Sequence, residues 1–542
     1  MRFWIVLAAS LSSVIAGCSG GKPVKDAEPA IPRVIQYVQS DEPRRLDPAF
    51  SKDLYEGIAN GLLFDGLVGF GAGAAVEPRL ADRWTTSPDG RLYDFHLRDG
   101  VTFHDGRPLR AGDVRYSFER LIHAATGSDR RWVLARVDGA AEFTSGLTPN
   151  LRGLTLPDGP DGRRVVMALA RPSPVFLTQL AMPAAAIIPE GAAGPAGEKP
   201  DGKFDRKPVG TGPWVLGKWQ HDRRIEFTRF PGYWNTAAAN AGVPQAAPSS
   251  LVWHVVSEDS TRRRLFETGK TDMYPVGFAS WEAWSRRPTP AGEAMTGVDE
   301  ISTTFFGVQC SGRPALRDPA VRRGLAAAID ADVIFRRLQH GRGRRAAGPV
   351  PPGVPGFREG RMPPARDLAA AKAALSTLAA DSRRAPLRLL YRQDALNAEI
   401  AAAARADLAA AGVMAEPMVR DQAALRQAVW GGDYDLFLGS WRLDYPDAEA
   451  VLAPCFHSRN VPRQGNQCHL RDDGLDRLIE AAETEVEPAR RLSAWQAAED
   501  RVIELSPWIP LFHPRGDFAV ARSLKDWRPA LMYNADRFDG RN

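Results

Sequence analysis

The chain has 542 residues, and its 70 lysines and arginines against 65 aspartates and glutamates give a formal net charge of +5. This length is well beyond the roughly 250 to 300 residues at which a single hydrophobic core stops growing, so it predicts two or three domains. Because both signs of charge are spread along the chain without a long block of either, the composition does not indicate nucleic-acid binding.

The N-terminus has the pattern of an export signal. Arg2 precedes an apolar stretch, Phe3 to Ala16, that is too short to span a membrane, and Gly17 and Cys18 follow it. The stretch resembles a bacterial lipoprotein signal, which implies removal of residues 1–17 and a lipid on the Cys18 thiol. An ordinary secretory peptide with an incidental cysteine is the alternative. Residues 18–31 are expected to be a flexible tether.

Residues 80–120 combine several local signals. Turn chemistry at residues 87–90 (SPDG) leads into the alternating run 92–97, which predicts a half-buried strand. Further turns at 98–100 and 104–106 enclose a second short strand over residues 101–103. The helix expected next has an apolar face made by Val114, Phe118, Leu121 and Ile122.

The wording of this segment, LADRWTTSPDGRLYDFHLRDGVTFHDGRPLRAGDVRYSFER, resembles the signature of extracellular solute-binding protein family 5, the dipeptide- and oligopeptide-binding lipoproteins of ABC importers. The resemblance implies an α/β, two-lobed periplasmic-binding-protein fold (class C, type II-like) with an extra small subdomain inserted in lobe one. It also implies a binding protein without cofactor or metal. Arg110 departs from the family, which tends to carry a helix-capping hydroxyl residue at this position.

Further segments resemble the family, and they occur along the chain in the same order as in the family. They are residues 46–48 with 55–67, residues 208–214 (PVGTGPW), 229–234 (RFPGYW), 318–334 and 490–512. The resemblance implies signal peptide 1–17, tether 18–31, lobe one from 32–67 with 181–298 and 508–542, an inserted subdomain from 68–180, and lobe two from 299–507.

Periodicity within the chain agrees with α/β lobes. An alternating first strand is predicted over residues 33–39, and later strands over 387–391 and 434–438. Residues 368–378 and 398–411 have helical patterns between them. This alternation of helices and strands favours sheets covered by helices.

Three cysteines follow Cys18. Cys455 and Cys468 flank a short loop, and in an oxidising compartment they are expected to form a disulfide worth about 3 kcal/mol. The alternative is a metal site with the adjacent His457 and His469, although their spacing matches no common zinc pattern. Cys310 follows the strand-like residues 303–308 and is expected to be a free, buried thiol.

The predicted ligand segment is residues 434–448, YDLFLGSWRLDYPDA. An apolar strand, 436–438, is expected to end before Trp441, and a carboxylate at Asp444 follows. Strand ends that carry aromatic rings and a carboxylate are suited to a cationic small molecule.

In the peptide-binding members of the family, the acidic residue three positions after this tryptophan pairs with the α-ammonium of the ligand. The resemblance therefore implies that role for Asp444, with Trp441 as an aromatic wall and Tyr445 and Asp447 close by. The alternative is that Asp444 and Asp447 only turn or cap the loop. For the ligand carboxylate, position in the sequence alone suggests Arg392, Arg442 or Arg459, and none is assigned.

Three functions are consistent with these patterns. The first is a monomeric periplasmic lipoprotein, anchored to the membrane by its lipid, that captures di- to oligopeptides and delivers them to the permease subunits of an ABC transporter in the inner membrane. The second keeps the fold but binds a nickel chelate, oligosaccharide, haem or opine. The third is a metal-dependent hydrolase built on residues 455, 457, 468 and 469. The chain lacks an H-E-x-x-H motif, which agrees with a binding role.

Overall fold

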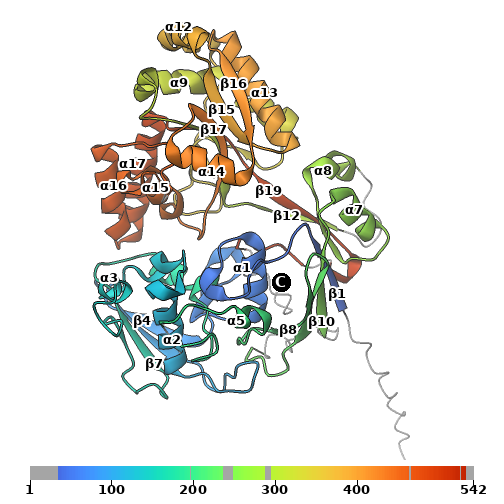
Figure 1. Ribbon diagram of the computed structural model, residues 1–542, viewed down its shortest axis with the longest axis vertical. Coiled ribbons are helices and arrows are strands. Elements are labelled where there is room, and N and C mark those ends of the chain that lie inside the picture. Colours follow the sequence, from blue (N-terminus) through green and yellow to red (C-terminus); the bar gives the residue numbers. More distant parts are fainter. Residues whose placement is uncertain are drawn as a thin grey trace, which may run out of the picture.

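The computed structural model describes residues 34–195, 197–235, 248–286, 294–462, 465–524 and 527–532. The expected signal peptide, Cys18 and the tether lie outside the described residues. Two large sheets, each covered by helices, form two lobes, and a smaller sheet with its own helices lies beside lobe one (Figure 1).

Lobe one is built on a seven-stranded sheet with the order β12-β19-β11-β1-β10-β9-β8. Strand β1 is parallel to β10 and β11, and the other neighbours are antiparallel. The strands are β1 (Val34–Gln39), β8 (Trp214–Gln220), β9 (Arg224–Arg229), β10 (Ser250–Val255), β11 (Met273–Pro275), β12 (Ala294–Asp299) and β19 (Arg515–Val520). The predicted first strand is confirmed as β1.

Helices cover both faces of this sheet. Helix α1 (Leu54–Leu63) packs with Val520 in one apolar cluster, whereas α7 (Asp259–Glu267) and α8 (Phe278–Ser285) pack with Ala519 in another. Because successive residues of a strand point to opposite faces, α1 lies on one side of the sheet and α7 and α8 lie on the other.

The inserted subdomain contains the signature segment. Its four-stranded sheet has the order β4-β5-β7-β6, and a separate hairpin pairs β2 with β3. Its main elements are β2 (Val68–Phe70), β3 (Val76–Pro78), β4 (Ala81–Thr86), β5 (Leu92–Leu97), β6 (Leu154–Thr155), β7 (Arg164–Ala168), α2 (Ala111–Ile122), α3 (Ala140–Thr144) and α4 (Phe176–Leu180).

Two of the three elements predicted within the signature segment are confirmed. The strand over 92–97 is β5, and the amphipathic helix is α2, whose preceding residue Arg110 makes no side-chain cap. The strand predicted over 101–103 is wrong. Residues 101 and 103 bond back to 109 and 107 across the tight turn, so they form one isolated bridge and join no sheet.

Lobe two has a six-stranded sheet with the order β14-β18-β13-β17-β15-β16. Its strands are β13 (Ser302–Val308), β14 (Arg344–Arg345), β15 (Leu387–Arg392), β16 (Ala415–Arg420), β17 (Leu436–Arg442) and β18 (Trp508–His513). Its main helices are α9 (Pro319–Ala328), α11 (Leu368–Ala374), α12 (Ser376–Arg384), α13 (Ala395–Ala410), α14 (Gln422–Gly431), α15 (Glu449–Phe456), α16 (Asp473–Thr484) and α17 (Pro488–Leu505).

Two sequence-based boundaries in lobe two need correction. The helix predicted over 368–378 is interrupted at Leu375, so it comprises the whole of α11 and the start of α12. Strand β17 does not stop before Trp441, because it stays paired with β13 as far as Arg442. Trp441 is therefore a strand residue, and the turn that carries Asp444 begins later than expected.

The chain crosses between the lobes at two adjacent points. Strands β12 and β13 are separated by two residues, β18 and β19 are separated by Pro514, and the amide of Glu300 donates to the carbonyl of Pro514 over 2.9 Å. The expected division assigned residues 508–542 to lobe one, but β18 pairs with β13 in the sheet of lobe two. We propose that this boundary lies at Pro514; the other expected domain boundaries remain proposals.

The predicted disulfide is wrong, since Cys455 and Cys468 are both free, buried thiols. Asn466 instead ties the loop between them: its amide nitrogen donates to the carbonyls of His457 and Leu470, over 3.2 and 2.9 Å. Burial raises the pKa of both thiols well above its usual range. Cys310 is free and buried, as expected.

The described residues contain no cluster of histidine, cysteine, aspartate and glutamate that could hold a metal ion, so the alternative of a Cys/His metal site is not supported there. Within the same residues, no helix combines the length and hydropathy needed to cross a membrane.

Candidate functional site

Asp444 lies in the turn after β17, at a contact between lobe two and the inserted subdomain. Its Oδ1 is 3.0 Å from Nη1 of Arg130, which belongs to the subdomain. The Asp444 side chain is 37 % exposed, and Oδ2 has no protein partner in the part of the chain that the structure describes. One carboxylate oxygen is therefore available to a ligand between the lobes.

Arg130 is held in place by lobe one. Its Nε donates to the carbonyl of Ser51 over 2.8 Å, and its Nη2 donates to the carbonyl of Lys52 over 3.1 Å. Only 9 % of the side chain is exposed. Because these two carbonyls precede α1, the guanidinium keeps its place in lobe one independently of Asp444.

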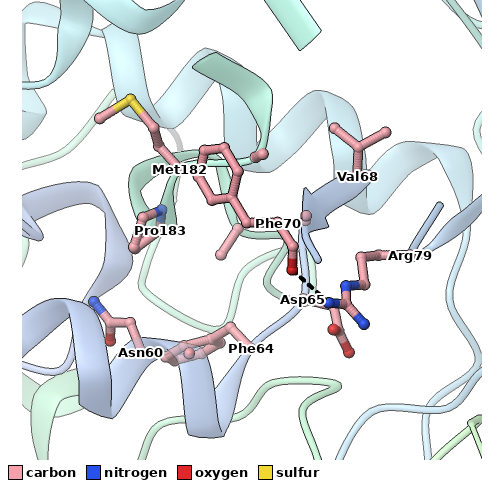
Figure 2. Close-up of a pocket in the computed structure, with 13 residues that line it drawn as sticks. Asn60, Phe64, Asp65, Val68, Phe70, Arg79, Met182 and Pro183 are labelled. Atoms are coloured by element: carbon pink, nitrogen blue, oxygen red, sulfur yellow. Dashed lines mark hydrogen bonds between the residues drawn. The ribbon is translucent and has the colours of Figure 1, made fainter. Parts of the chain in front are cut away.

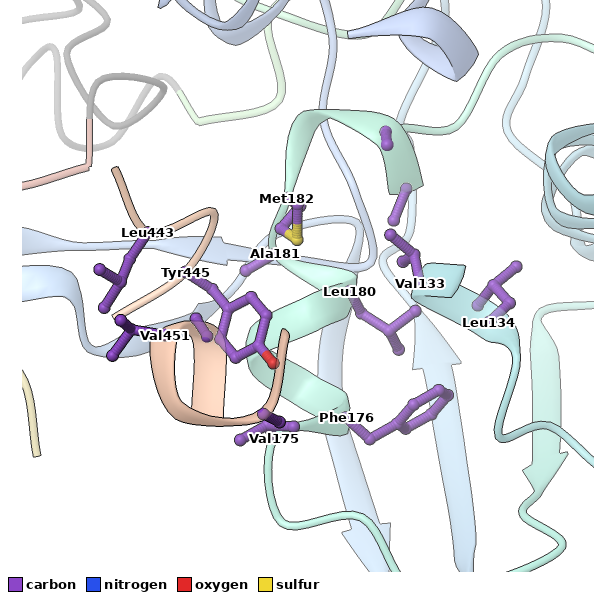
Figure 3. Packing of buried hydrophobic residues seen from close by; sticks show 14 of the residues in the cluster. Val133, Leu134, Val175, Phe176, Leu180, Ala181, Met182, Leu443, Tyr445 and Val451 are labelled. Atoms are coloured by element: carbon purple, nitrogen blue, oxygen red, sulfur yellow. The ribbon is translucent and has the colours of Figure 1, made fainter. Parts of the chain in front are cut away.

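Trp441 and Tyr445 have different surroundings. The Trp441 indole is half-buried, and its Nε1 donates to the carbonyl of Ala450 over 2.9 Å. Tyr445 is 5 % exposed and packs on α4, where Figure 3 shows its ring beside Val175 and Ala181. Tyr445 thus joins lobe two to the subdomain. Trp441 keeps some exposed ring surface, as its expected role as an aromatic wall requires.

Asp447 is buried in an ion pair within lobe two. Its two oxygens accept hydrogen bonds from Nη1 and Nη2 of Arg491 over 2.8 and 2.9 Å, and Oδ1 also accepts from the amide of Glu449. These contacts match the alternative considered for this residue, in which its carboxylate caps the loop. Of the four predicted ligand residues, only Asp444 and Trp441 keep substantial exposure.

A second ion pair crosses the same contact. Nη2 of Arg136, from the subdomain, donates to Oε1 of Glu449 over 2.8 Å, and Nη1 donates to the carbonyl of Glu483 over 3.2 Å. Both carboxylates are nearly fully buried. Sequence reasoning missed Arg130 and Arg136, because arginines in an irregular segment carry no local signal for a partner that lies so far along the chain.

Comparison with known proteins agrees with this architecture. The family model "Bacterial extracellular solute-binding proteins, family 5 Middle" matches residues 75–463. The chain belongs to this family. It is 28 % identical to the "Probable di/tripeptide-binding protein 5" of Pseudomonas aeruginosa over 92 % of this chain and 94 % of that protein. It is 25 % identical to the "Dipeptide-binding protein" of Escherichia coli K12, with coverage of 91 % and 92 %.

Solved structures share the fold. The Helicobacter pylori binding protein DppA in complex with the peptide STSA has a TM-score of 0.75 and 21 % identity, over 93 % of this chain and 97 % of that one. AppA of Bacillus subtilis, in complex with a nonapeptide, has a TM-score of 0.75 and 18 % identity, with coverage of 94 % and 99 %. The expected two-lobed α/β fold is confirmed, as is a substrate-binding protein rather than an enzyme.

In this family 5 chain, the three arginines suggested for a ligand carboxylate are already paired. Arg442 pairs with Glu300, Arg392 with Asp394, and Arg459 with Glu483. Each carboxylate belongs to the protein itself, so the structure provides no reason to prefer one of the three.

A small cavity between lobe one and the inserted subdomain does not extend the site. Figure 2 shows Asn60, Phe64 and Met182 around it, and its volume is about 30 Å³. The Asn60 amide is buried there, and neither of its polar atoms has a hydrogen-bond partner within the described residues. The space suits one or two water molecules, and it is far too small for a peptide.

Glu449 gives the contact between lobe two and the subdomain a dependence on pH. Burial raises the pKa of Glu449 to about 7; the guanidinium of Arg136 acts in the opposite direction, and Asp447, Arg491 and Glu483 also face the carboxyl group. Since the pKa is higher in the folded than in the unfolded protein, the stabilisation is complete below about pH 4.5 and is lost as the pH rises through about 7.

Replacing Glu449 by glutamine keeps the uncharged state at every pH. We expect the difference in melting temperature, variant minus unmodified protein, to increase as the pH is raised from about 5 to about 8. Thermal melting followed by circular dichroism across this range measures the difference. A difference that stays constant with pH would contradict the raised pKa.

Proposed function

We propose that this protein captures peptides between its two lobes and delivers them to the permease of an ABC transporter, while a lipid on Cys18 holds it at the membrane. The observation that carries the proposal is Asp444, a carboxylate at the junction of the lobes with one unpaired oxygen. A peptide ammonium is a suitable partner, because charge-assisted hydrogen bonds are the stronger ones. The relatives are named as di/tripeptide- and dipeptide-binding proteins, which supports peptides as the ligand class.

Thermal stabilisation by peptides tests the proposal. We expect the mature protein to melt at a higher temperature with some members of a mixture of two- to five-residue peptides, because ligand at about one hundred times its Kd adds about 2.7 kcal/mol to the free energy of unfolding. The same peptides with acetylated amino ends are the matched controls and should stabilise the protein less. The proposal fails if no peptide changes the melting temperature.

Native mass spectrometry of protein purified from the producing cell addresses the other solutes considered for this fold. A peptide carried through purification supports the proposal, whereas a co-purified metal chelate, oligosaccharide, haem or opine replaces it. The mass of the N-terminal proteolytic fragment tests the lipid, since a diacylglycerol on Cys18 adds to the mass of the unmodified fragment.

A further inference from the structure

A larger cavity lies where the two lobes are joined. Its volume is about 360 Å³, and it is lined by residues of α8, β12 and β19 in lobe one and by the loop 341–343 of lobe two. Figure 1 shows α8 beside the two long strands that connect the lobes. None of the residues that line it is Asp444, Arg130 or one of the two residues whose carbonyls hold Arg130.

The loop from lobe two brings an arginine into this cavity. Nε of Arg342 donates to Oδ2 of Asp517 over 3.2 Å, and Nη2 donates to the carbonyl of Val276 over 3.1 Å. The guanidinium also lies 4.7 Å from the centre of the Trp281 ring. At Gly343, φ is +94° and a Cβ atom would be 2.0 Å from the carbonyl of His513, so only glycine allows the loop this close approach.

The wall of the cavity has more positive than negative charge. Asp517, whose side chain is 4 % exposed, is shared by Arg342 and by Arg515, whose Nε lies 2.9 Å from Oδ1. One carboxylate thus faces two guanidinium groups. The Arg515 side chain is 45 % exposed, and its terminal nitrogens have no hydrogen-bond partner among the described residues. These nitrogens can therefore donate hydrogen bonds to an anion in the cavity.

Apolar surface lies next to this cation. Trp281 is half-buried, and Met295 is 37 % exposed although it is a large apolar residue. The volume is at the lower end of the roughly 300 to 1,000 Å³ of small-molecule sites, which are mostly apolar with a few placed polar groups. A ligand that combines one carboxylate with a small apolar body matches all of these features.

We propose that this cavity, here named the hinge cavity, binds such a carboxylate, with Arg515 pairing with the carboxylate and Trp281 and Met295 contacting the apolar body. A planar guanidinium offers two parallel N–H groups to a carboxylate, which suits Arg515 for this role. The carboxylate comes either from a free small acid or from the carboxyl end of a captured peptide. In the second case the inference rests on the proposed function.

Isothermal titration of the mature protein with N-acetyl-leucine and with its amide tests the site. The acid carries a carboxylate and an apolar body but no ammonium group, so it does not depend on Asp444. We expect the acid to bind and the amide to bind at least about tenfold more weakly, since a charge-assisted hydrogen bond is lost. The inference is overturned if the two bind equally or neither binds.

Matched arginine variants locate the binding. Arg515→Gln should weaken binding of the acid about tenfold or more, and Arg515→Lys should restore part of it. Arg344→Gln is the control, because the Arg344 side chain is equally exposed, at 45 %, but pairs with Asp299 and Glu359 outside the cavity lining. Equal affinity of Arg515→Gln and the unmodified protein for the acid, with melting temperatures unchanged, overturns the inference.

Peptides distinguish the two sources. If amidation of the carboxyl end weakens a peptide that binds, and Arg515→Gln weakens it to a similar extent, the carboxylate belongs to the captured peptide. If the acid binds but peptides are unaffected by Arg515→Gln, a free acid occupies the cavity. If no peptide binds but the acid does, the proposed function is wrong, and the inference that the hinge cavity binds a carboxylate is retained.

Discussion

Replacing Asp444 by alanine is expected to weaken peptide binding by about ten- to a hundredfold, because one charge-assisted hydrogen bond of about 1.5 to 3 kcal/mol is lost. The carboxylate is partly exposed, and Arg130 keeps its hydrogen bonds to the carbonyls of Ser51 and Lys52, so we expect the variant to fold while the ligand ammonium loses its partner. Isothermal titration with a peptide that raises the melting temperature measures the loss.

The control for this variant is Asp381→Ala, which removes an exposed aspartate of α12 in the same lobe. Its affinity should equal that of the unmodified protein. An acetylated peptide provides the complementary comparison, since it should bind the unmodified protein and Asp444→Ala with similar affinity. Unchanged binding of the free peptide by Asp444→Ala would remove Asp444 from the site.

Loss of the Asp47 carboxylate is expected to be the largest single effect on stability, at about 3 to 5 kcal/mol. Both oxygens of Asp47 accept hydrogen bonds from the guanidinium of Arg120, and the two side chains are only 1 % and 4 % exposed. Asp47→Ala leaves a buried cation without its counter-ion. The melting temperature, followed by circular dichroism, should fall clearly.

An exposed pair of similar geometry is the control. Arg110 and Asp161 are 2.7 Å apart, but their side chains are 53 % and 80 % exposed, so Asp161→Ala should cost no more than about 1 kcal/mol. Since Arg120 is in α2 of the subdomain and Asp47 precedes α1 in lobe one, the buried pair joins the two parts. Equal and small changes for both variants would show that this junction contributes little.

Sequence patterns predicted local structure where the controlling interactions are short in range. Strand β5 and helix α2 follow from a turn and from apolar spacing, and both have the expected position. The strand expected over 101–103 failed because its residues bond across their own turn. The expected disulfide is also wrong: Cys455 and Cys468 are free, and Asn466 bonds to the carbonyls of His457 and Leu470 in the same loop.

The candidate site was only partly predictable. The resemblance to the family pointed to the segment after β17, and Asp444 does lie between the lobes with a free oxygen. Residue type alone could not show that Tyr445 is covered by the subdomain or that Asp447 is paired with Arg491. The burial of both residues is decided by segments distant in sequence, and Arg130 reaches Asp444 only because Ser51 and Lys52 hold it there.

The pairing of Arg130 with Asp444 bears on how a ligand would approach. The site contains one fixed cation and one anion at 3.0 Å, so at long range the pair presents a dipole rather than a negative charge. Electrostatic steering requires a net field that extends over about a Debye length, roughly 8 Å at physiological ionic strength. Arrival of a peptide would therefore be governed by diffusion, and its ammonium group would be recognised only after it has entered between the lobes.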